Sequence, residues 1–265
     1  MAQTVDFAVG AGARRRLVNE PISDAERQVR VELAAAYRLA QLNGWDELIY
    51  NHISARVPGT EDHFLINPYG LSFDEVTASN LVKVDLDGNI IGSSDYPING
   101  AGFTIHSAIH GARHDAGCVL HLHTEAGVAV SMLEEGLLPM SQTAMLFHGN
   151  MAFHEYEGIA LDLDERKRLI DDLGDKTTMI LRNHGTLVVG KNVAEAFTRM
   201  YLLEKACKSQ LQAMACNVPL HRAGKDVADK TGKMFNVGMP RYGGADTAWA
   251  AMMRRLDRID TSYKN

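Results

Sequence analysis

Apolar residues recur at helical spacing in several stretches of the chain. The first stretch follows Ser23, where Ser23 and Glu26 have the spacing of a capping box that would satisfy free N–H groups at a helix start. Asn192 and Glu195 repeat that spacing before a long apolar-periodic stretch. The predicted helices cover residues 24–43, 103–114, 124–134, 164–173, 192–215 and 246–258.

Short runs of alternating apolar and polar residues lie between these helices and predict strands. The runs cover residues 52–57, 64–66, 82–86, 117–123, 178–181 and 186–189. Asn67-Pro68-Tyr69-Gly70 and Asp87-Gly88 have the residues of tight turns. Many short strands interspersed with helices indicate a mixed α/β layer structure.

The chain shows no internal repeat and no low-complexity segment that would divide it early. We expect a mobile N-terminal arm over residues 1–22 and one domain over residues 23–216. A C-terminal extension over residues 217–265 would consist of a linker and one short helix. The segment from His148 to His154 is predicted to be a loop near the functional site or a subunit contact.

Composition narrows the class of protein. The 265 residues are 46% hydrophobic and 23% charged, which is typical of a globular protein. The net charge of −6 argues against nucleic acid or a membrane surface as the main partner, because both favour a basic face. Three cysteines without CxxC spacing favour a reducing compartment, so we expect a cytoplasmic protein.

Histidines form the most informative motif. His121 and His123 are two residues apart in a predicted strand, so both side chains point to the same face and can converge on one ion. His184, in Arg182-Asn183-His184-Gly185, interrupts two apolar runs and could supply a third ligand. Three histidines would leave an open coordination position, as catalytic zinc sites require. The alternative is a pair of half-exposed strand histidines and an ordinary Asn-Gly hairpin turn.

A second histidine pattern lies on the predicted helix over residues 103–114. His106, His110 and His114 are four residues apart and form one stripe. Ser107 stands where the HExxH metalloprotease motif requires Glu, so a metalloprotease site is rejected. We interpret the stripe as a packing and hydrogen-bonding face, in which His106 could support the metal ligands from behind.

The motifs together resemble the class II aldolase/adducin family over residues 25–216, and within it the adducin-head branch. The matching segments are Asn51-His52-Ile53-Ser54, Ile66-Asn67-Pro68-Tyr69-Gly70, Val119-Leu120-His121-Leu122-His123-Thr124 and Leu181-Arg182-Asn183-His184-Gly185. The resemblance implies a three-layer α/β/α fold around a central mixed or antiparallel sheet, usually in a homotetramer. It also implies a divalent ion, typically zinc, held by His121, His123 and His184, which polarises a substrate carbonyl or enediolate.

The chain also departs from the family's sugar-phosphate aldolases. Those enzymes carry Ser-Ser-Glu four residues before a histidine that matches His106, and that Glu is their usual acid/base. Here the run is Gly100-Ala101-Gly102, so Gly102 stands at the Glu position and the phosphate-binding serines are absent. The phosphate-binding loop reads Tyr50-Asn51-His52 instead of the glycine-rich form. We therefore expect a non-phosphorylated substrate.

A carbanion or enediolate step needs another acid/base group within hydrogen-bond reach. The candidates are Glu125, two residues after His123, and Tyr69, which lies in a loop of the family's pocket. Glu125 also fits a structural role, because the helix dipole favours an acid in the first turn. The candidates for binding substrate are Asn51, Asn67 and Arg182, which could equally satisfy loop backbone or pair with a surface acid.

These motifs favour a metal-dependent lyase, aldolase- or decarboxylase-like. It would act through a metal-stabilised enolate on a small non-phosphorylated carbonyl or carboxylate substrate. Zinc is the expected ion, with manganese or iron as alternatives, and a homotetramer is the expected assembly. The alternative is a non-catalytic, adducin-like oligomerisation module. The chain ends at Asn265 without the adducin neck and tail, which argues against this alternative. An iron site for oxygen chemistry is less favoured, because a two-histidine, one-carboxylate pattern is not evident.

Overall fold

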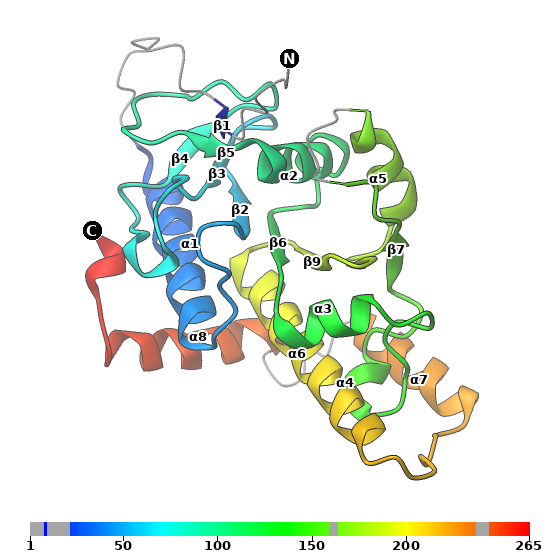
Figure 1. The fold of residues 1–265 in the computed structure, drawn as a ribbon. Helices are drawn as coiled ribbons and strands as arrows, with labels where there is room; N and C mark the ends of the chain where they lie inside the picture. The colour runs from blue at the N-terminus through cyan, green and yellow to red at the C-terminus, as the bar shows by residue number, and fades with distance from the viewer. Residues whose placement is uncertain (1–7, 10–21, 159–163, 237–243) are drawn as a thin grey trace.

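A computed structural model describes residues 8–9, 22–158, 164–236 and 244–265 of the chain. Within these residues, seven strands form one sheet in the order β4-β3-β2-β6-β9-β8-β7 (Figure 1). The strands are β2 (His52–Arg56), β3 (Phe64–Ile66), β4 (Val82–Val84), β6 (Cys118–Leu122), β7 (Ala152–His154), β8 (Thr178–Leu181) and β9 (Gly185–Gly190). All neighbours are antiparallel except β7 and β8, which are parallel, so the sheet is mixed.

Helices cover both faces of this sheet. The long helices α1 (Asp24–Leu42) and α6 (Val193–Ala215) and the short α3 (Glu125–Ser131) pack on one face. The other face carries α2 (Gly100–Ala112) and α5 (Glu165–Leu173). This arrangement confirms the three-layer α/β/α fold.

Strand alternation divides the core between the two faces. In β6, Leu120 and Leu122 join the apolar cluster beneath α1 and α6, whereas Val119 joins the cluster beneath α2 and α5. His121 therefore points to the α2 side, because successive side chains of a strand point to opposite faces. The same rule places His52 and Ser54 of β2 on the α2 side, opposite to Ile53.

The helix starts confirm the predicted capping residues. The Ser23 side chain accepts the Glu26 N–H at 3.1 Å, and the Asn192 side chain accepts the Glu195 N–H at 2.8 Å. The Glu26 carboxylate does not complete a capping box, because it accepts hydrogen bonds from Arg30 and Lys83 instead. A short-range rule thus predicted the helix start, while long-range contacts determine where the Glu26 side chain lies.

Three sequence predictions need correction. The segment before His154 is not all loop, because Ala152–His154 pairs with β8 as strand β7. The region after residue 217 holds two helices, α7 (Lys225–Asn236) and α8 (Gly244–Asp257), where one was predicted. Helix α2 ends at Ala112, so His114 lies outside the helix and is exposed, and only two histidines form the stripe.

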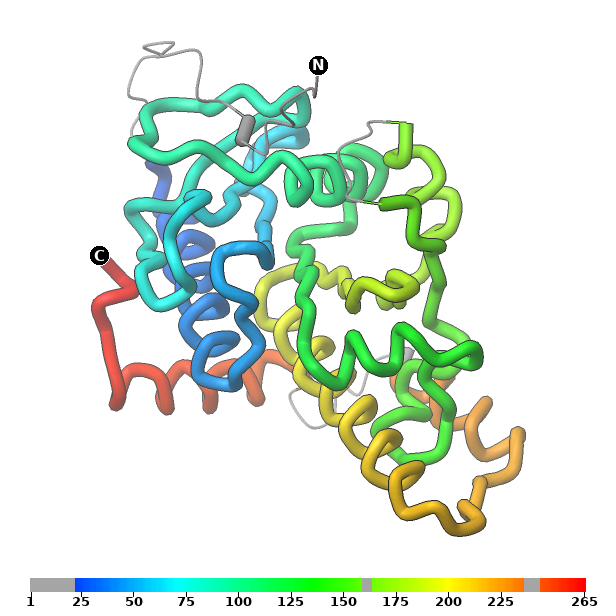
Figure 2. Tube along the Cα trace, viewed as in Figure 1, coloured from blue at the N-terminus to red at the C-terminus, as the bar shows by residue number. Residues whose placement is uncertain are grey.

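Segments near both ends of the described chain contact the rest of the structure. Trp249, Leu256 and Tyr263 are buried in the same core cluster as α1 and α6, and Figure 2 shows α8 running beneath α1. At the other end, β1 (Ala8–Val9) pairs antiparallel with β5 (Ile98–Asn99), while the rest of the predicted arm before residue 22 lies outside the described residues. The remaining elements are α4 (Gln142–Met145) and two 3-10 turns, Phe73–Glu75 and Ser262–Lys264.

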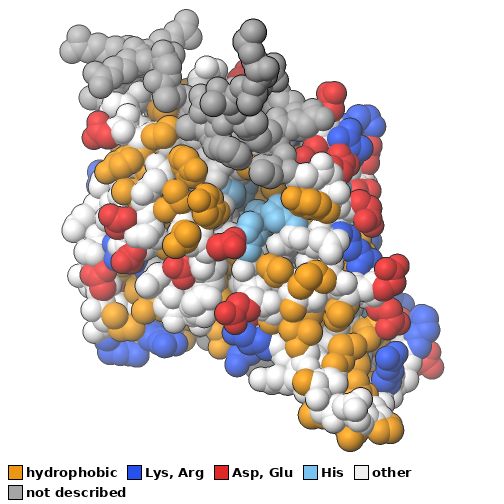
Figure 3. Space-filling model, viewed as in Figure 1, with side chains coloured by type: hydrophobic (Ala, Val, Ile, Leu, Met, Phe, Trp, Pro, Cys, Tyr) orange, Lys and Arg blue, Asp and Glu red, His pale blue; other side chains and the backbone are white. Residues whose placement is uncertain are grey.

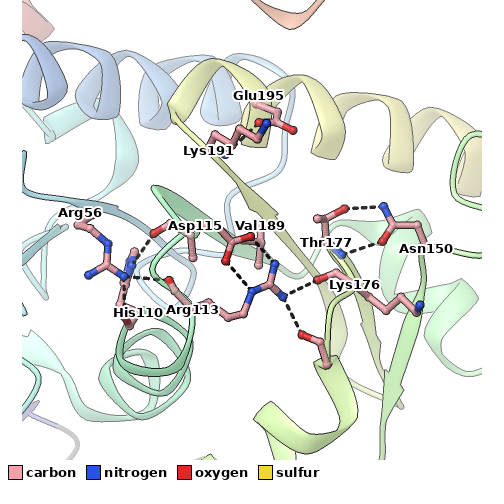
Figure 4. A network of polar contacts seen from close by, with 12 residues as sticks. Arg56, His110, Arg113, Asp115, Asn150, Lys176, Thr177, Val189, Lys191 and Glu195 are labelled. Atoms are coloured by element: carbon pink, nitrogen blue, oxygen red, sulfur yellow. Dashed lines mark hydrogen bonds and ion pairs between the residues drawn. The ribbon is translucent and has the colours of Figure 1, made fainter. Parts of the chain in front are cut away.

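A polar network fixes the C-terminal end of α2 near the N-terminal end of β6 (Figure 4). The Arg56 guanidinium donates to the carbonyls of His110 at 2.6 Å and Arg113 at 3.0 Å. Arg113 in turn pairs with Asp115 at 2.7 Å and donates to the carbonyl of Lys176 at 3.1 Å. These bonds hold α2 in a fixed position against β2. The N-terminal half of α2 therefore lies beside the other end of the strands, where β6 ends.

None of the helices in the described part of the chain is both long and apolar enough to cross a lipid bilayer.

Candidate metal centre

Three histidines meet at the C-terminal end of β6, the central strand of the sheet. His121 is in β6, His123 follows that strand, and His184 lies in the turn between β8 and β9. One ring nitrogen from each lies within 4.8 Å of the others. Figure 3 shows histidine side chains together at the surface near the middle of the drawn face. The structure thus brings together the three predicted ligands.

The turn that carries His184 is tightly constrained. Leu181 of β8 pairs with Gly185 of β9, so three residues close the hairpin, and Asn183 adopts a left-handed conformation with φ of 56°. A Cβ atom on Gly185 would lie 2.7 Å from the carbonyl oxygen of Leu122. The Asn-His-Gly sequence therefore allows the turn to approach β6 closely enough for His184 to reach the other two histidines.

The geometry of the three rings suits a small divalent ion. The Nε2 atoms of His121 and His123 are 3.0 Å apart, near the separation of about 3.3 Å that two nitrogens have around a tetrahedral zinc. Ring centroids of His184 lie 4.7 Å from His121 and 4.6 Å from His123. Three nitrogens at these separations surround one point and leave a fourth direction for another ligand.

Groups behind the ligands fix which nitrogen of each ring faces that point. His121 Nδ1 lies 3.2 Å from the carbonyl oxygen of Thr186, which can only accept, so Nδ1 carries the proton. His123 Nδ1 forms a hydrogen bond with the Glu47 carboxylate in the same way. Nε2 of both rings is therefore free to bind metal, as in carboxylate–histidine–zinc arrangements. Glu47 was not predicted, because it lies in a loop without a recognisable motif.

Burial keeps these rings in their metal-binding form. Desolvation, followed by repulsion from His184 and His123, lowers the pKa of His121 well below its usual range. Desolvation and the neighbouring His123 lower the pKa of His184 to about 4. Both rings are neutral at pH 7, which is the protonation state that coordinates a metal ion. The donor set therefore fits zinc or a similar divalent ion.

A second histidine cluster lies behind the ligands, between β2 and α2. Ser54 Oγ is within 2.5 Å of His106 Nδ1 and 2.8 Å of His110 Nε2, so one hydroxyl joins both helix histidines. Burial is the main cause that lowers the pKa of His106 and of His110 to about 3. The His106 ring packs edge-on against His52 with centroids 5.8 Å apart. His106 thus contacts Ser54 and His52, and its support of the metal ligands stays a prediction.

His52 connects the two clusters. It is the residue of β2 paired with His121 in β6, and the two rings stack with centroids 6.1 Å apart. The His52 side chain is 4% exposed, yet neither ring nitrogen has a hydrogen-bond partner among the described residues. Burial is also the main cause that lowers its pKa well below the usual range. His52 lies within one of the motifs that carry the family resemblance, but no role was predicted for it.

The predicted substrate-binding asparagines differ in their contacts. Asn51 is fully buried, and its side-chain amide has no partner within the described part of the chain. The Asn67 side chain, in contrast, accepts a hydrogen bond from the Tyr37 hydroxyl at 2.9 Å. Tyr69 lies in the turn after β3, is half-buried, and donates its backbone N–H to the carbonyl of Pro97. Asn51 is therefore the predicted residue with free hydrogen-bonding groups.

The predicted charged candidates lie at the margin of the site. Glu125 is exposed in the first turn of α3, the position that the helix dipole favours. The Arg182 guanidinium donates to the carbonyl of Leu133 at 2.7 Å and lies 4.4 Å from the Phe153 ring centroid. Glu155 is 4.0 Å from Arg182, which is the surface-acid alternative considered from the sequence. The substrate-directed roles of Glu125 and Arg182 stay predictions.

A small pocket beside His184 contains His154, which ends the segment that the sequence predicted to lie near the functional site or at a subunit contact. The pocket is lined in part by His154, Glu165, Arg182 and His184. His154 is 4% exposed, at the end of β7, and its Nδ1 lies 2.7 Å from the Asp172 carboxylate. Its Nε2 faces the Glu165 carboxylate at 3.5 Å, and burial raises the pKa of Glu165. The parallel pairing of β7 with β8 places this group near the metal centre.

Fold and site together define a protein of the class II aldolase type. The chain belongs to the family described as the Class II Aldolase and Adducin N-terminal domain, whose sequence profile matches residues 31–211. A Caulobacter vibrioides protein, named provisionally as an aldolase class 2 protein, is 53% identical over 91% of this chain and 94% of its own length. Alpha-adducin of Rattus norvegicus is 44% identical over 88% of this chain, which spans only 34% of the adducin.

Solved structures agree with this assignment. An aldolase II superfamily protein from Pseudomonas syringae is 51% identical with a TM-score of 0.87, covering 92% of this chain and 98% of its own. An L-fuculose 1-phosphate aldolase from Glaciozyma antarctica PI12 is 28% identical with a TM-score of 0.79, covering 94% of this chain and 96% of its own. The family resemblance predicted from the motifs is confirmed over a longer segment than the motifs themselves.

Proposed function

We propose that this protein is a divalent-metal-dependent lyase of the class II aldolase type, acting on a small, non-phosphorylated carbonyl or carboxylate substrate. The observation that carries the proposal is the convergence of ring nitrogens from His121, His123 and His184 within 4.8 Å, with one direction left open. A bound divalent ion would polarise a substrate oxygen and stabilise the negative charge that develops when a neighbouring carbon bond breaks.

The chain's own residues prepare the site for this chemistry. Glu47 and the Thr186 carbonyl orient two of the ligand rings, so the donor nitrogens do not have to reorganise when an ion binds. Burial of His121 removes water from one side of the site and strengthens electrostatic interactions there. Asn51 offers a free buried amide for orienting substrate, and Tyr69 and Glu125 are the candidates for proton transfer.

Two features support a substrate without phosphate. Gly102 and its neighbours supply no hydroxyls at the positions where the family's sugar-phosphate aldolases carry serines. Bulky Tyr50 and His52 flank Asn51 where those enzymes have a glycine-rich loop, and the His52 ring fills space beside α2. The L-fuculose 1-phosphate aldolase relative therefore supports the reaction class, while its phosphorylated substrate is not transferred to this chain.

Zinc is the ion we propose, with manganese or iron as alternatives that a three-histidine set also accepts. We also propose a homotetramer, which the family resemblance implies. A cytoplasmic location is supported by three cysteines that are all free, two of them buried.

Elemental analysis of protein purified without a histidine tag tests the proposal. We expect one divalent ion per chain in the wild type and loss of that ion in His121→Ala. His114→Ala is the matched control, because His114 is exposed and outside the site. The metal-loaded protein is then assayed for aldol cleavage and decarboxylation of non-phosphorylated hydroxyketones and keto acids, with and without chelator.

The outcomes separate the two function classes. Turnover that disappears with chelator and in His121→Ala supports the lyase. Absence of metal, with no uptake of added zinc, manganese or iron by the intact oligomer, would overturn it. That result would favour the non-catalytic, adducin-like module instead.

A further inference from the structure

His52 is a buried imidazole without a partner at the centre of the candidate site. Both ring nitrogens lack a hydrogen bond within the described residues, although the side chain is 4% exposed. Ser54, two residues along the same face of β2, shows the contrast, because it forms hydrogen bonds with both His106 and His110. A buried polar group without a partner destabilises the fold, and a ligand that binds beside it would supply the missing partner.

The position of the ring is linked to Gly102. A Cβ atom on Gly102 would lie 2.5 Å from two carbons of the His52 ring and 2.7 Å from its Nε2 atom. Any side chain at position 102 and the observed His52 ring therefore exclude each other. The imidazole of His52 occupies the space that a side chain at position 102 would enter.

The ring also lies beside the metal centre. His52 stacks on the ligand His121 with ring centroids 6.1 Å apart, and His106 closes its other side. His106 bonds Ser54 through Nδ1, and its Nε2 has no partner among the described residues, so His52 is the imidazole of this pair with both nitrogens available. A neutral imidazole offers one N–H donor and one acceptor, a pair that suits a substrate hydroxyl or carbonyl oxygen.

We propose that His52 binds an oxygen of the substrate beside the metal ion, in place of the absent side chain at position 102. This inference rests on the proposed function, because it assigns the residue that receives the substrate of that metal site. The ligand class is a small hydroxycarbonyl compound whose oxygen reaches the face of β2. His52 is thus a substrate-binding residue, and the absence of a side chain at Gly102 leaves room for its ring.

Binding of glycolohydroxamate, a planar chelating analogue of an enediolate, tests the inference on zinc-loaded full-length protein. The measurements are the dissociation constant from calorimetry, the zinc content after titration, and the melting temperature of each metal-free variant. His52→Leu keeps similar volume without hydrogen bonding, and His52→Gln keeps a donor and an acceptor. His114→Leu, which replaces an exposed histidine, is the matched control.

We expect His52→Leu to weaken glycolohydroxamate binding about tenfold while the zinc content stays at the wild-type level. His52→Gln should retain binding within about threefold. The melting temperature of metal-free His52→Leu should equal or exceed that of the wild type, because the substitution removes an unpartnered polar group from the interior. A merely structural histidine would lose stability instead.

Gly102→Ala provides an independent perturbation. It leaves the imidazole chemistry intact but displaces the ring, so it should weaken glycolohydroxamate binding about as much as His52→Leu. Unchanged binding in His52→Leu with zinc retained would overturn the role of His52. Loss of zinc in His52→Leu would overturn it too, by making His52 a metal ligand. Zinc-loaded wild type that does not bind glycolohydroxamate would refute the ligand class, whereas a wild type that holds no metal refutes the proposed function itself.

Discussion

Replacing Glu47 by Gln tests whether a carboxylate behind His123 tunes the metal site. The Glu47 carboxylate accepts the Nδ1–H of His123, so it favours the tautomer with Nε2 free and raises the electron density of the ring. Glutamine can still accept that hydrogen bond through its amide oxygen. The substitution therefore removes the charge while leaving the geometry nearly unchanged.

The magnitude follows from the exposure of the pair. Loss of an outer hydrogen-bond partner typically weakens metal binding by about 10- to 100-fold. The Glu47 side chain is 53% exposed, so solvent screens its charge and the effect should fall at the lower end. We expect Glu47→Gln to raise the zinc dissociation constant about tenfold, which corresponds to about 1.4 kcal/mol. Glu47→Ala, which also releases the ring, should cost more.

Competition with a chromophoric chelator at pH 7.5 measures the zinc affinity of each variant. Asp46→Asn is the matched control, because it removes the same charge from the neighbouring exposed residue. Zinc affinity of Glu47→Gln within twofold of the wild type would refute the reasoning. An equal loss in Asp46→Asn would assign the effect to net charge near the site and not to the hydrogen bond with His123.

Two further predictions concern the parts of the fold that support the site. Tyr37→Phe should lower the free energy of unfolding by about 3 kcal/mol in urea titrations, because it leaves the N–H groups of Ile53 and Asn67 buried without their hydroxyl partner. Glu26→Gln should cost about 3 kcal/mol at pH 7, because it breaks a buried ion pair of that carboxylate. Burial alone would raise the pKa of Glu26, but hydrogen bonds from Lys83 and Arg30 lower it below 4.5, so its stabilisation is present above that pH and is lost as the pH falls through the folded pKa. The stability difference between wild type and Glu26→Gln should therefore shrink as the pH falls below 4.5 in urea titrations, and a constant difference would contradict the assignment.

The three histidines of the candidate metal centre could be predicted because each sits in a local pattern. His121 and His123 share one face of a strand by simple alternation, and His184 interrupts two apolar runs with a turn sequence. The sequence pattern alone does not show that β6 ends beside the turn between β8 and β9. That step came from the family resemblance, and the register between β6 and β9 confirms it.

The groups around the ligands could not be predicted in the same way. Glu47 meets His123 across 76 positions of sequence, and nothing in its own neighbourhood marks it. The segment that ends at His154 was predicted near the site as a loop, but its pairing in parallel with β8 as a strand depends on a distant segment and has no local signal. Local periodicity thus predicts the scaffold and the ligands, whereas the groups that orient them depend on contacts between distant segments.

The exclusion between His52 and residue 102 gives a prediction that needs no substrate. In the wild-type background, Gly102→Ala should destabilise the protein by about 2 kcal/mol, because the new Cβ atom lies 2.5 Å from a ring that is itself buried. In a His52→Ala background the same change should be neutral or stabilising by up to about 1 kcal/mol, since alanine is the better helix former. Gly111→Ala is the control within α2, because its Cβ would meet Leu86 at an ordinary 3.6 Å. Urea titrations of the four variants of this cycle, and of Gly111→Ala in both backgrounds, measure the coupling free energy with position 52. We expect about 2 kcal/mol for position 102 and near zero for position 111. Additive effects at position 102 would show that the ring moves freely aside, and the imidazole would then not be held at the position from which it is proposed to bind substrate.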